Sequence, residues 1–196
     1  MIKIHCMPLG AYQTNCYIVH TLESKKCIII DPGYEAHTIC DKLDELGLDP
    51  EAILLTHGHF DHVGAVRDLA ATTGCQVYLR VEETTMPPQL TAGPLYYTNE
   101  YPDEGKLQVA GMDILVVHTP GHTPGSVCLL IENAMFSGDT LFAGSMGRCD
   151  FPGSSIFDMR KSLRKLCRLT TDYRVFPGHG PDSTLDFEKK TNPYLR

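Results

Sequence analysis

The chain has 196 residues, of which 42% are hydrophobic and 21% are charged. This composition excludes a disordered or fibrous protein, and the length is that of one domain with a full hydrophobic core. Lysine and arginine together number 17 against 24 aspartates and glutamates, so the net charge is −7. Because a surface this acidic repels polyanions, we expect neither nucleic acid nor a membrane as a partner.

The cysteines and the lengths of the apolar runs indicate the cellular compartment of the protein. No apolar run approaches the roughly 18 residues that a membrane span needs, and the N-terminal segment MIKIHCMPLG lacks the apolar stretch of a secretion signal. The eight cysteines include no Cys-x-x-Cys pair. We therefore expect reduced thiols in a cytoplasmic protein.

Strand-like and helix-like stretches alternate along the first half of the chain, which predicts an α/β protein. In chain order, we expect strands at 3–4, 15–19 and 27–30, a helix at 36–46, a strand at 52–55, a helix at 62–73 and a strand at 76–79. Residues 81–105 follow as an irregular, proline-rich segment. We interpret this segment as a lid or binding loop, with a solvated insertion as the alternative. Tyr96 and Tyr97 are candidate substrate contacts.

The second half begins with strands and contains the clearest helix of the chain. In order, we expect strands at 109, 114–117, 127–131 and 134–136, a helix at 155–170 and a strand at 175–176. Ser155 and Asp158 resemble a capping box at the start of the helix. One helix face is apolar and the other is basic, with Arg160, Lys161, Arg164, Lys165 and Arg168. We interpret the basic face as solvated surface, with an anionic substrate as the alternative.

A dense group of histidines lies between the strand at 52–55 and the next helix. The motif is His57-x-His59-x-Asp61-His62, and a hydrophobic core does not require such a cluster. Imidazole and carboxylate are ligands that suit zinc and similar divalent ions. In an extended segment, side chains two residues apart point to the same side, so His57 and His59 can bind one ion together. Asp61 and His62 are displaced from that pair and are candidates for a second ion.

Three further candidate ligands follow, each in a loop at the end of a strand and beside glycine: His122, Asp139 and His179. In α/β proteins, functional side chains from separate loops commonly meet at one edge of the sheet. A single histidine or aspartate in a loop means little, but the joint pattern indicates a metal site.

The ligand motif, followed by His122, Asp139 and His179 in that order, resembles the metallo-β-lactamase superfamily. The sequence Gly138-Asp139-Thr140-Leu141-Phe142, with Gly144-Ser145-Met146-Gly147-Arg148 after it, is similar to the glyoxalase II branch and its small single-domain bacterial relatives. The resemblance implies a four-layer αβ/βα sandwich. Only 17 residues follow His179, so we expect one domain over residues 1–196 without the helical C-terminal domain that helps glyoxalase II to hold glutathione.

The resemblance also implies a role for each ligand. His57, His59 and His122 would bind the first ion, Asp61, His62 and His179 the second, and Asp139 would bridge both. Asp31, in the turn after a strand, is a candidate for orienting a ligand imidazole, with a simple turn residue as the alternative. We expect two divalent ions, zinc first, with iron or manganese as alternatives.

The chemistry of such a pair of ions agrees with the resemblance. Two cations lower the pKa of a bridging water from about 16 toward neutrality and polarise a carbonyl, so no protein nucleophile is needed. Asp61 and Asp139, with the metal-bound hydroxide, are the expected catalytic groups. Gly-x-Ser-x-Gly is absent from the sequence, so a serine hydrolase is not indicated.

We therefore predict a metal-dependent hydrolase of small-molecule thioesters. Arg148 is the candidate contact for a substrate carboxylate, as in glyoxalase II-like proteins, with a salt bridge to Asp150 as the alternative. An iron-dependent persulfide dioxygenase is the second hypothesis, because Gly147-Arg148-Cys149-Asp150-Phe151 resembles a sequence of that group. A non-catalytic metal-binding module is the third, and the acidic charge disfavours a nuclease.

Overall fold

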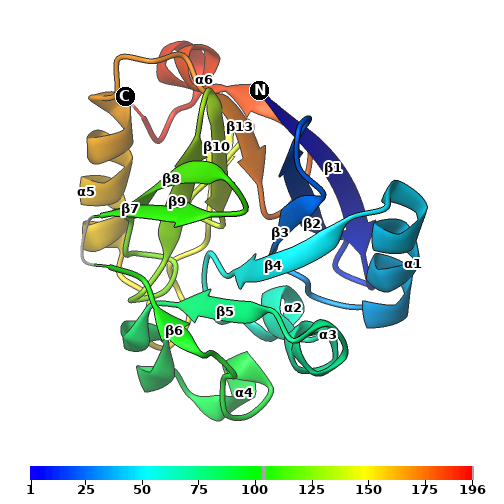
Figure 1. The fold of residues 1–196 in the computed structure, drawn as a ribbon. Helices are drawn as coiled ribbons and strands as arrows, with labels where there is room; N and C mark the ends of the chain where they lie inside the picture. The colour runs from blue at the N-terminus through cyan, green and yellow to red at the C-terminus, as the bar shows by residue number, and fades with distance from the viewer. Residues whose placement is uncertain (103–104, 196) are drawn as a thin grey trace.

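The computed structural model describes residues 1–102 and 105–195, and Figure 1 shows two twisted sheets with helices outside them. The first sheet runs in the order β1-β2-β3-β4-β5-β6. Its strands are β1 (Ile2–Leu9), β2 (Thr14–Thr21), β3 (Lys26–Ile30), β4 (Asp49–Leu54), β5 (Gln76–Leu79) and β6 (Asn99–Glu100). The pairs β1/β2 and β2/β3 are antiparallel, and the strands from β3 to β6 are parallel.

The second sheet runs in the order β14-β13-β10-β9-β8-β7. Its strands are β7 (Lys106–Val109), β8 (Met112–His118), β9 (Val127–Ile131), β10 (Ala134–Gly138), β13 (Arg174–Pro177) and β14 (Ser183–Thr184). β10 and β13 are parallel, so their carboxyl ends lie at the same edge. A small hairpin, β11 (Leu141–Phe142) and β12 (Ser145–Met146), follows β10.

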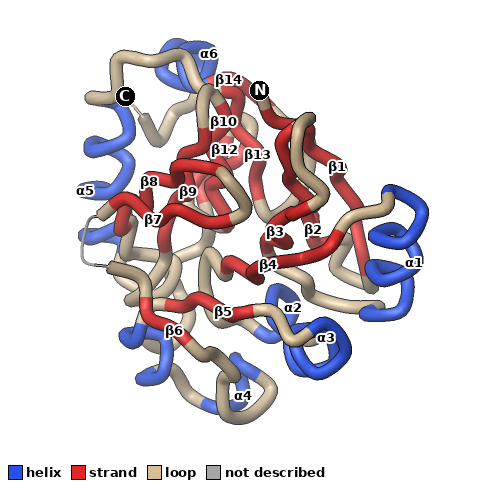
Figure 2. The backbone as a smooth tube through the Cα atoms, in the orientation of Figure 1, coloured by secondary structure: helices blue, strands red, loops and turns tan. Residues whose placement is uncertain are grey.

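Helices cover the outer face of each sheet, as the blue segments of Figure 2 show. The helices are α1 (Ala36–Leu46), α2 (Phe60–Val63), α3 (Val66–Thr73), α4 (Pro88–Thr91), α5 (Ile156–Cys167) and α6 (Leu185–Thr191), with a 3₁₀ turn, η1, over Val81–Thr85. α1 and α3 pack on the first sheet and α5 packs on the second. This is the expected four-layer αβ/βα sandwich.

The hydrophobic core has three parts, which correspond to the three spaces between layers. Strand β3 shows why, because its side chains alternate between two buried faces: Ile28 and Ile30 face the second sheet, while Cys27 and Ile29 face α1 and α3. A strand covered on both faces is apolar throughout, as this one is. In α5, the apolar face that contains Met159 packs on the second sheet.

Two expected elements differ from the structure. The helix expected over 62–73 is two helices, α2 and α3, because the amide of Ala65 donates to the carbonyl of Pro32 and not to the preceding helical turn. The segment 81–105 is not irregular throughout, since it contains η1, α4 and β6, and its residues 103–104 lie outside the described residues. β14, α6 and the β11–β12 hairpin were not expected.

No helix in the described part of the chain is long and apolar enough to cross a membrane. All eight cysteines are free thiols in the structure.

Candidate metal centre

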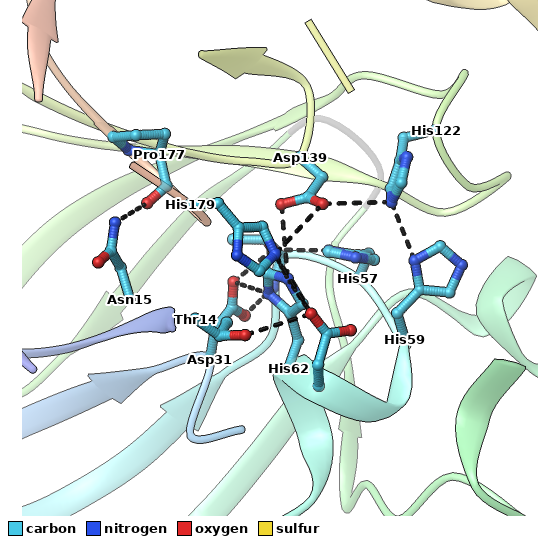
Figure 3. Close-up of polar contacts among 12 residues, drawn as sticks. Thr14, Asn15, Asp31, His57, His59, His62, His122, Asp139, Pro177 and His179 are labelled. Atoms are coloured by element: carbon cyan, nitrogen blue, oxygen red, sulfur yellow. Dashed lines mark hydrogen bonds and ion pairs between the residues drawn. The ribbon is translucent and has the colours of Figure 1, made fainter. Parts of the chain in front are cut away.

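The candidate ligands lie in loops and at strand ends of both sheets, and Figure 3 shows that their side chains converge. From the first sheet, the segment after β4 carries His57 and His59, and α2 carries Asp61 and His62. The second sheet contributes three more ligands. They are His122 from the loop between β8 and β9, Asp139 directly after β10, and His179 after β13.

His57, His59 and His122 form the first group. One ring nitrogen from each lies within 4.8 Å of the others. Nε2 of His122 is 2.9 Å from Nδ1 of His59. All three residues are at least 94% buried. Three imidazoles in this arrangement form the donor set of a divalent metal site with an open fourth position.

Asp61, His62 and His179 form the second group, again with one ligand atom from each within 4.8 Å of the others. Nε2 of His179 is 3.2 Å from Oδ2 of Asp61 and 3.4 Å from Nε2 of His62. Asp139 faces both groups, because its Oδ2 is 3.4 Å from Nε2 of His122 and its Oδ1 is 3.4 Å from Nε2 of His62. The carboxylate of Asp139 is therefore placed as a bridge.

Asp31 orients two of the imidazoles. Oδ2 of Asp31 is 2.9 Å from Nδ1 of His62 and 2.6 Å from the hydroxyl of Thr56, which lies 3.1 Å from Nδ1 of His57. The backbone amide of Thr56 also donates to Asp31. Asp31, His57 and His62 also have ligand-type atoms within 4.8 Å of one another. Because these donors engage the oxygens of Asp31, its position is that of an orienting residue, and both imidazoles present Nε2 to the centre. Its φ of 50° places this turn residue in the left-handed region that aspartate tolerates.

Backbone carbonyls orient two more rings. Nδ1 of His122 donates to the carbonyl of Arg148 at 2.8 Å, and Nδ1 of His179 donates to the carbonyl of Tyr12 at 3.2 Å. Each bond fixes the protonated nitrogen on the outer side of the ring. The lone pair of Nε2 is consequently directed into the site, as a metal ligand requires.

Unpartnered polar atoms test whether a metal ion fits these residues. Four buried side-chain nitrogen or oxygen atoms among the described residues have no hydrogen-bond partner, and three of them, Nε2 of His57, Nε2 of His59 and Oδ1 of Asp139, belong to this cluster. A buried polar atom without a partner is costly, and a cation would satisfy Nε2 of His57 and Oδ1 of Asp139. His59 presents its other nitrogen, Nδ1, toward His122. The donors are only imidazole and carboxylate, so the residues fit zinc, iron or manganese.

The two groups differ in their protonation. Burial lowers the pKa of His57, and burial together with His122 lowers that of His59 to about 4, so the first group is neutral. Burial acts against protonation of His62 as well, but Asp139 and Asp31 outweigh it and raise its pKa to about 9. Burial would raise the pKa of Asp61, yet the hydrogen bond from His179 and the charge of His62 lower it. In the second group, His62 is therefore protonated because of the negative charge of nearby carboxylates. A bound cation could neutralise the same charge.

The centre lies in the wall of a pocket of about 680 Å³. Besides the candidate ligands, the pocket is lined mainly by apolar and aromatic side chains, with one serine and one arginine: Tyr12, Phe60, Leu90, Phe142, Met146, Phe151, Ser145 and Arg148. The guanidinium of Arg148 forms two hydrogen bonds to the carboxylate of Asp150, at 2.6 and 2.7 Å, and lies over the ring of Phe151. Arg148 therefore lines the pocket, and the structure contains the salt bridge to Asp150 that was the alternative to a substrate contact.

The two tyrosines expected as substrate contacts do not line this pocket. The ring of Tyr96 lies under the guanidinium of Arg67, and Tyr97 packs in the core between the first sheet and its helices. The chain after them runs beside β5, where Thr98 bonds to Val77. The segment 81–105 contributes Leu90 to the pocket instead.

Glu83 is a functional candidate that the sequence did not suggest. Its carboxylate is completely buried in η1 and accepts the backbone amides of Gly58 and Gly125, each at 2.6 Å. Gly58 separates His57 from His59, and Gly125 lies in the loop of His122, so Glu83 joins the two loops of the first group. Burial raises its pKa to about 7, although these amides favour the charged form. Its partners are backbone groups, which leave no motif to recognise.

The N-terminal strands secure the last ligand. The amide of Asn15 donates to the carbonyl of Gly178 at 2.8 Å, and the side chain of Asn15 donates to the carbonyl of Pro177 at 3.0 Å (Figure 3). Tyr17 adds a bond of 2.6 Å to the same carbonyl. The loop of His179 is therefore fixed by β2, which lies in the other sheet.

Comparison with known proteins agrees with this geometry. The family model of the metallo-beta-lactamase superfamily matches residues 9–179. Hydroxyacylglutathione hydrolase GloC of Haemophilus influenzae is 35% identical, and the match covers 99% of this chain and 98% of that protein.

Two solved structures are similar over nearly their whole length. The crystal structure of the BLEG-1 B3 metallo-beta-lactamase has a TM-score of 0.89 at 37% identity, covering 100% of this chain and 99% of that one. The structure of TTHA1623 in a di-iron-bound form has a TM-score of 0.82 at 38% identity, covering 97% and 99%. On its sequence, fold and cluster of ligand-type residues, the chain belongs to the metallo-beta-lactamase superfamily.

Proposed function

We propose that this protein is a dinuclear metal-dependent hydrolase that cleaves thioesters, in the manner of glyoxalase II. The observation that carries the proposal is the pair of three-residue donor groups joined by Asp139 in the wall of one pocket. Support for the thioester comes from the likeness to GloC, whose name describes hydrolysis of a hydroxyacylglutathione.

In this proposal, His57, His59 and His122 would hold one ion, Asp61, His62 and His179 would hold the other, and Asp139 would contact both. Such ions would supply a hydroxide at neutral pH and polarise a carbonyl. The residues around them fix the geometry: Asp31 and Thr56 hold the imidazoles of the two sites, and Thr14 donates to Oδ2 of Asp61 at 3.2 Å. The ionised carboxylate of Asp61 remains an acceptor for a proton from the attacking water.

The pocket is shaped for a substrate with an apolar portion. Phe60, Phe142 and Phe151 contribute aromatic surface beside the ligands, and Arg148 contributes a cation at the rim. Burial of the donor groups excludes bulk water, which strengthens electrostatic interactions at the reacting carbonyl.

The test combines metal analysis with two assays on the purified protein. We expect two divalent ions per chain and hydrolysis of a hydroxyacylglutathione thioester that stops on chelation and returns with zinc. His59→Ala should remove the activity, whereas His37→Ala, at an exposed histidine remote from the centre, should not. One iron per chain with oxygen uptake on a persulfide, and no thioester hydrolysis, would instead identify a dioxygenase.

A further inference from the structure

A second hollow, beside the catalytic pocket, is lined by three arginines. Its volume is about 650 Å³, and its wall includes Arg160, Arg164 and Arg168 of the α5 segment. Opposite them lie Tyr194 and its neighbours near the C-terminus. Met146 lines both this hollow and the catalytic pocket, so the two adjoin. We call this feature the arginine hollow.

The three arginines form one stripe. They are four residues apart, so their side chains lie on the same side of α5, with Cα atoms about 6 Å apart along the axis. No ion pair or hydrogen bond joins their side chains to any residue within 1–102 and 105–195. Other cations on α5 do have partners: Lys161 pairs with Asp158, and Lys165 donates to the carbonyl of His118. In a chain of net charge −7, three unpaired guanidiniums in one hollow mark a site for an anion.

Both walls of the hollow are fixed relative to the candidate metal centre. At the start of α5, the amide of Ser155 donates to the carbonyl of Gly121, and the hydroxyl of Ser154 donates to the carbonyl of His122. The opposite wall is anchored by the buried side chain of Asn192, which donates to the carbonyl of Ser145 at 3.0 Å and to Glu188. The stripe of arginines therefore begins near His122 and runs away from it for about 12 Å from Arg160 to Arg168.

Charge at the end of a helix does not explain the hollow. Cations in the last turn interact favourably with the helix dipole, which accounts for Arg164, Lys165 and the C-cap residue Arg168. It does not account for Arg160, two turns earlier, nor for the exposed ring of Tyr194 and side chain of Ile156 that complete the wall. A row of planar guanidiniums beside aromatic and apolar surface matches a ligand that carries several phosphates on an organic group.

We propose that the arginine hollow binds the phosphate groups of the substrate's thiol carrier, so that the protein acts on thioesters of a phosphorylated thiol. This inference rests on the proposed function, since it assigns the carrier portion of the same substrate. The acyl end and the sulfur lie in the catalytic pocket, the thiol arm passes Met146, and the phosphates contact the arginines.

The experiment compares one acyl group on three carriers: coenzyme A, which bears phosphates, pantetheine, which has the same thiol arm without them, and glutathione. We expect the wild-type kcat/KM for the coenzyme A thioester to exceed that for the pantetheine thioester at least tenfold. Arg164→Gln should lower the former about tenfold and leave the latter unchanged. Lys161→Gln, on the same helix but outside the hollow, is the matched control and should alter neither.

A binding measurement separates the two proposals. Calorimetry with adenosine 3′,5′-bisphosphate, which has phosphates and no thioester, should show binding to the wild-type protein and to Lys161→Gln but weakened binding to Arg164→Gln. Equal rates on coenzyme A and pantetheine thioesters, or a preference for glutathione, would overturn the inference and leave the thioesterase intact. Bisphosphate binding without hydrolysis of any thioester would overturn the proposed function but retain the anion site.

Discussion

Four of the five imidazoles of the candidate centre, those of His57, His62, His122 and His179, have an orienting partner. The two groups are tested separately by mutation. His59→Ala leaves two ligands in the first group, so we expect loss of that ion and of activity. His179→Ala should mainly weaken the second ion and retain the first, because the three imidazoles of the first group all remain. Metal analysis of both variants after dialysis checks this expectation. Full metal content and an unchanged rate in His59→Ala would show that the ligand assignment is wrong.

Arg148 gives a test of charge in the substrate. We expect Arg148→Ala to reduce kcat/KM about ten- to a hundredfold for a thioester with a carboxylate near the reacting carbon, since a charge-assisted hydrogen bond contributes about 1.5–3 kcal/mol. Arg148→Lys should recover only part of the loss, because an ammonium lacks the planar fork. Steady-state rates on matched charged and neutral thioesters measure the effect.

The control for Arg148 is its neighbour. Asp150→Asn removes the partner that holds the guanidinium in the structure and should not reduce the rate on the charged thioester. If Arg148→Ala reduced the hydrolysis rates of the charged and the neutral thioesters equally, the contacts of Arg148 with Asp150 and Phe151 would be structural. The proposed contact with a substrate carboxylate would then be wrong.

Glu83 predicts a pH dependence of stability. Its pKa rises from an ordinary value of 4.5 to about 7 on folding, so between these values the folded protein binds more protons than the unfolded chain. The free energy of unfolding therefore falls with rising pH across that window, by at most about 1.4 kcal/mol per pH unit, and the contribution is constant above it. We expect the difference in free energy of unfolding between wild type and Glu83→Gln to show this slope. Urea denaturation at pH 5 to 8 in the presence of chelator measures it.

Glu82 supplies the contrasting case for that measurement. Its side chain pairs with Arg80, which lowers its pKa, so Glu82→Gln should not reproduce the slope of Glu83→Gln. The same slope in both variants, or none in Glu83→Gln, would contradict the assignment to Glu83.

Among the secondary-structure elements, α2 depends on a close contact with the turn after β3. A Cβ atom on Gly33 would lie 1.7 Å from the carbonyl oxygen of Asp61. Gly33→Ala must therefore displace α2 together with Asp61 and His62. We expect a lower unfolding temperature and loss of the second ion, measured by thermal denaturation and metal analysis.

Gly74→Ala is the control for that steric effect. A Cβ atom there meets nothing within 4 Å, and only its φ of 71° adds a cost of about 1 kcal/mol. Retention of both ions in Gly33→Ala would show that α2 tolerates displacement without loss of the site.

Patterns of neighbouring residues predicted the helices and strands whose ends and faces are determined by those same residues. The helix at 155–170 appears as α5, and Ser155 accepts the amide of Asp158 as the cap. The break between α2 and α3 was not predictable, because it depends on the carbonyl of Pro32, which lies far back in the chain. β14 and the β11–β12 hairpin have only two residues per strand, too few for any periodicity to appear.

The same distinction applies to the site. The spacing of His57, His59, Asp61 and His62 was sufficient to predict a metal centre, because the ligands themselves form the pattern. The clamp by Glu83 was not predictable, since its acceptor oxygens bind backbone amides 25 and 42 residues away. Tyr96 and Tyr97 were chosen for their type within a loop, and composition says nothing about the direction in which a loop side chain points.

At the level of the fold, the candidate centre lies where the two sheets meet and takes ligands from both. Bound ions would therefore connect the halves of the sandwich and stabilise only the folded state. We expect chelation to lower the unfolding temperature, and a ligand at a thousand times its dissociation constant contributes about 4 kcal/mol. Thermal denaturation with chelator and with added zinc measures the shift. His179→Ala should show a smaller shift, and an equal shift in that variant would contradict a second ion bound through His179.

The attachment of the loop of His179 to Asn15 and Tyr17 has a consequence for biosynthesis. A chain emerging from the ribosome presents His57 to His62 long before residue 179 is made. During that interval only part of the donor set exists. The second donor group is complete only when the loop after β13 docks on β2. A second ion can therefore be held only after synthesis has passed residue 179.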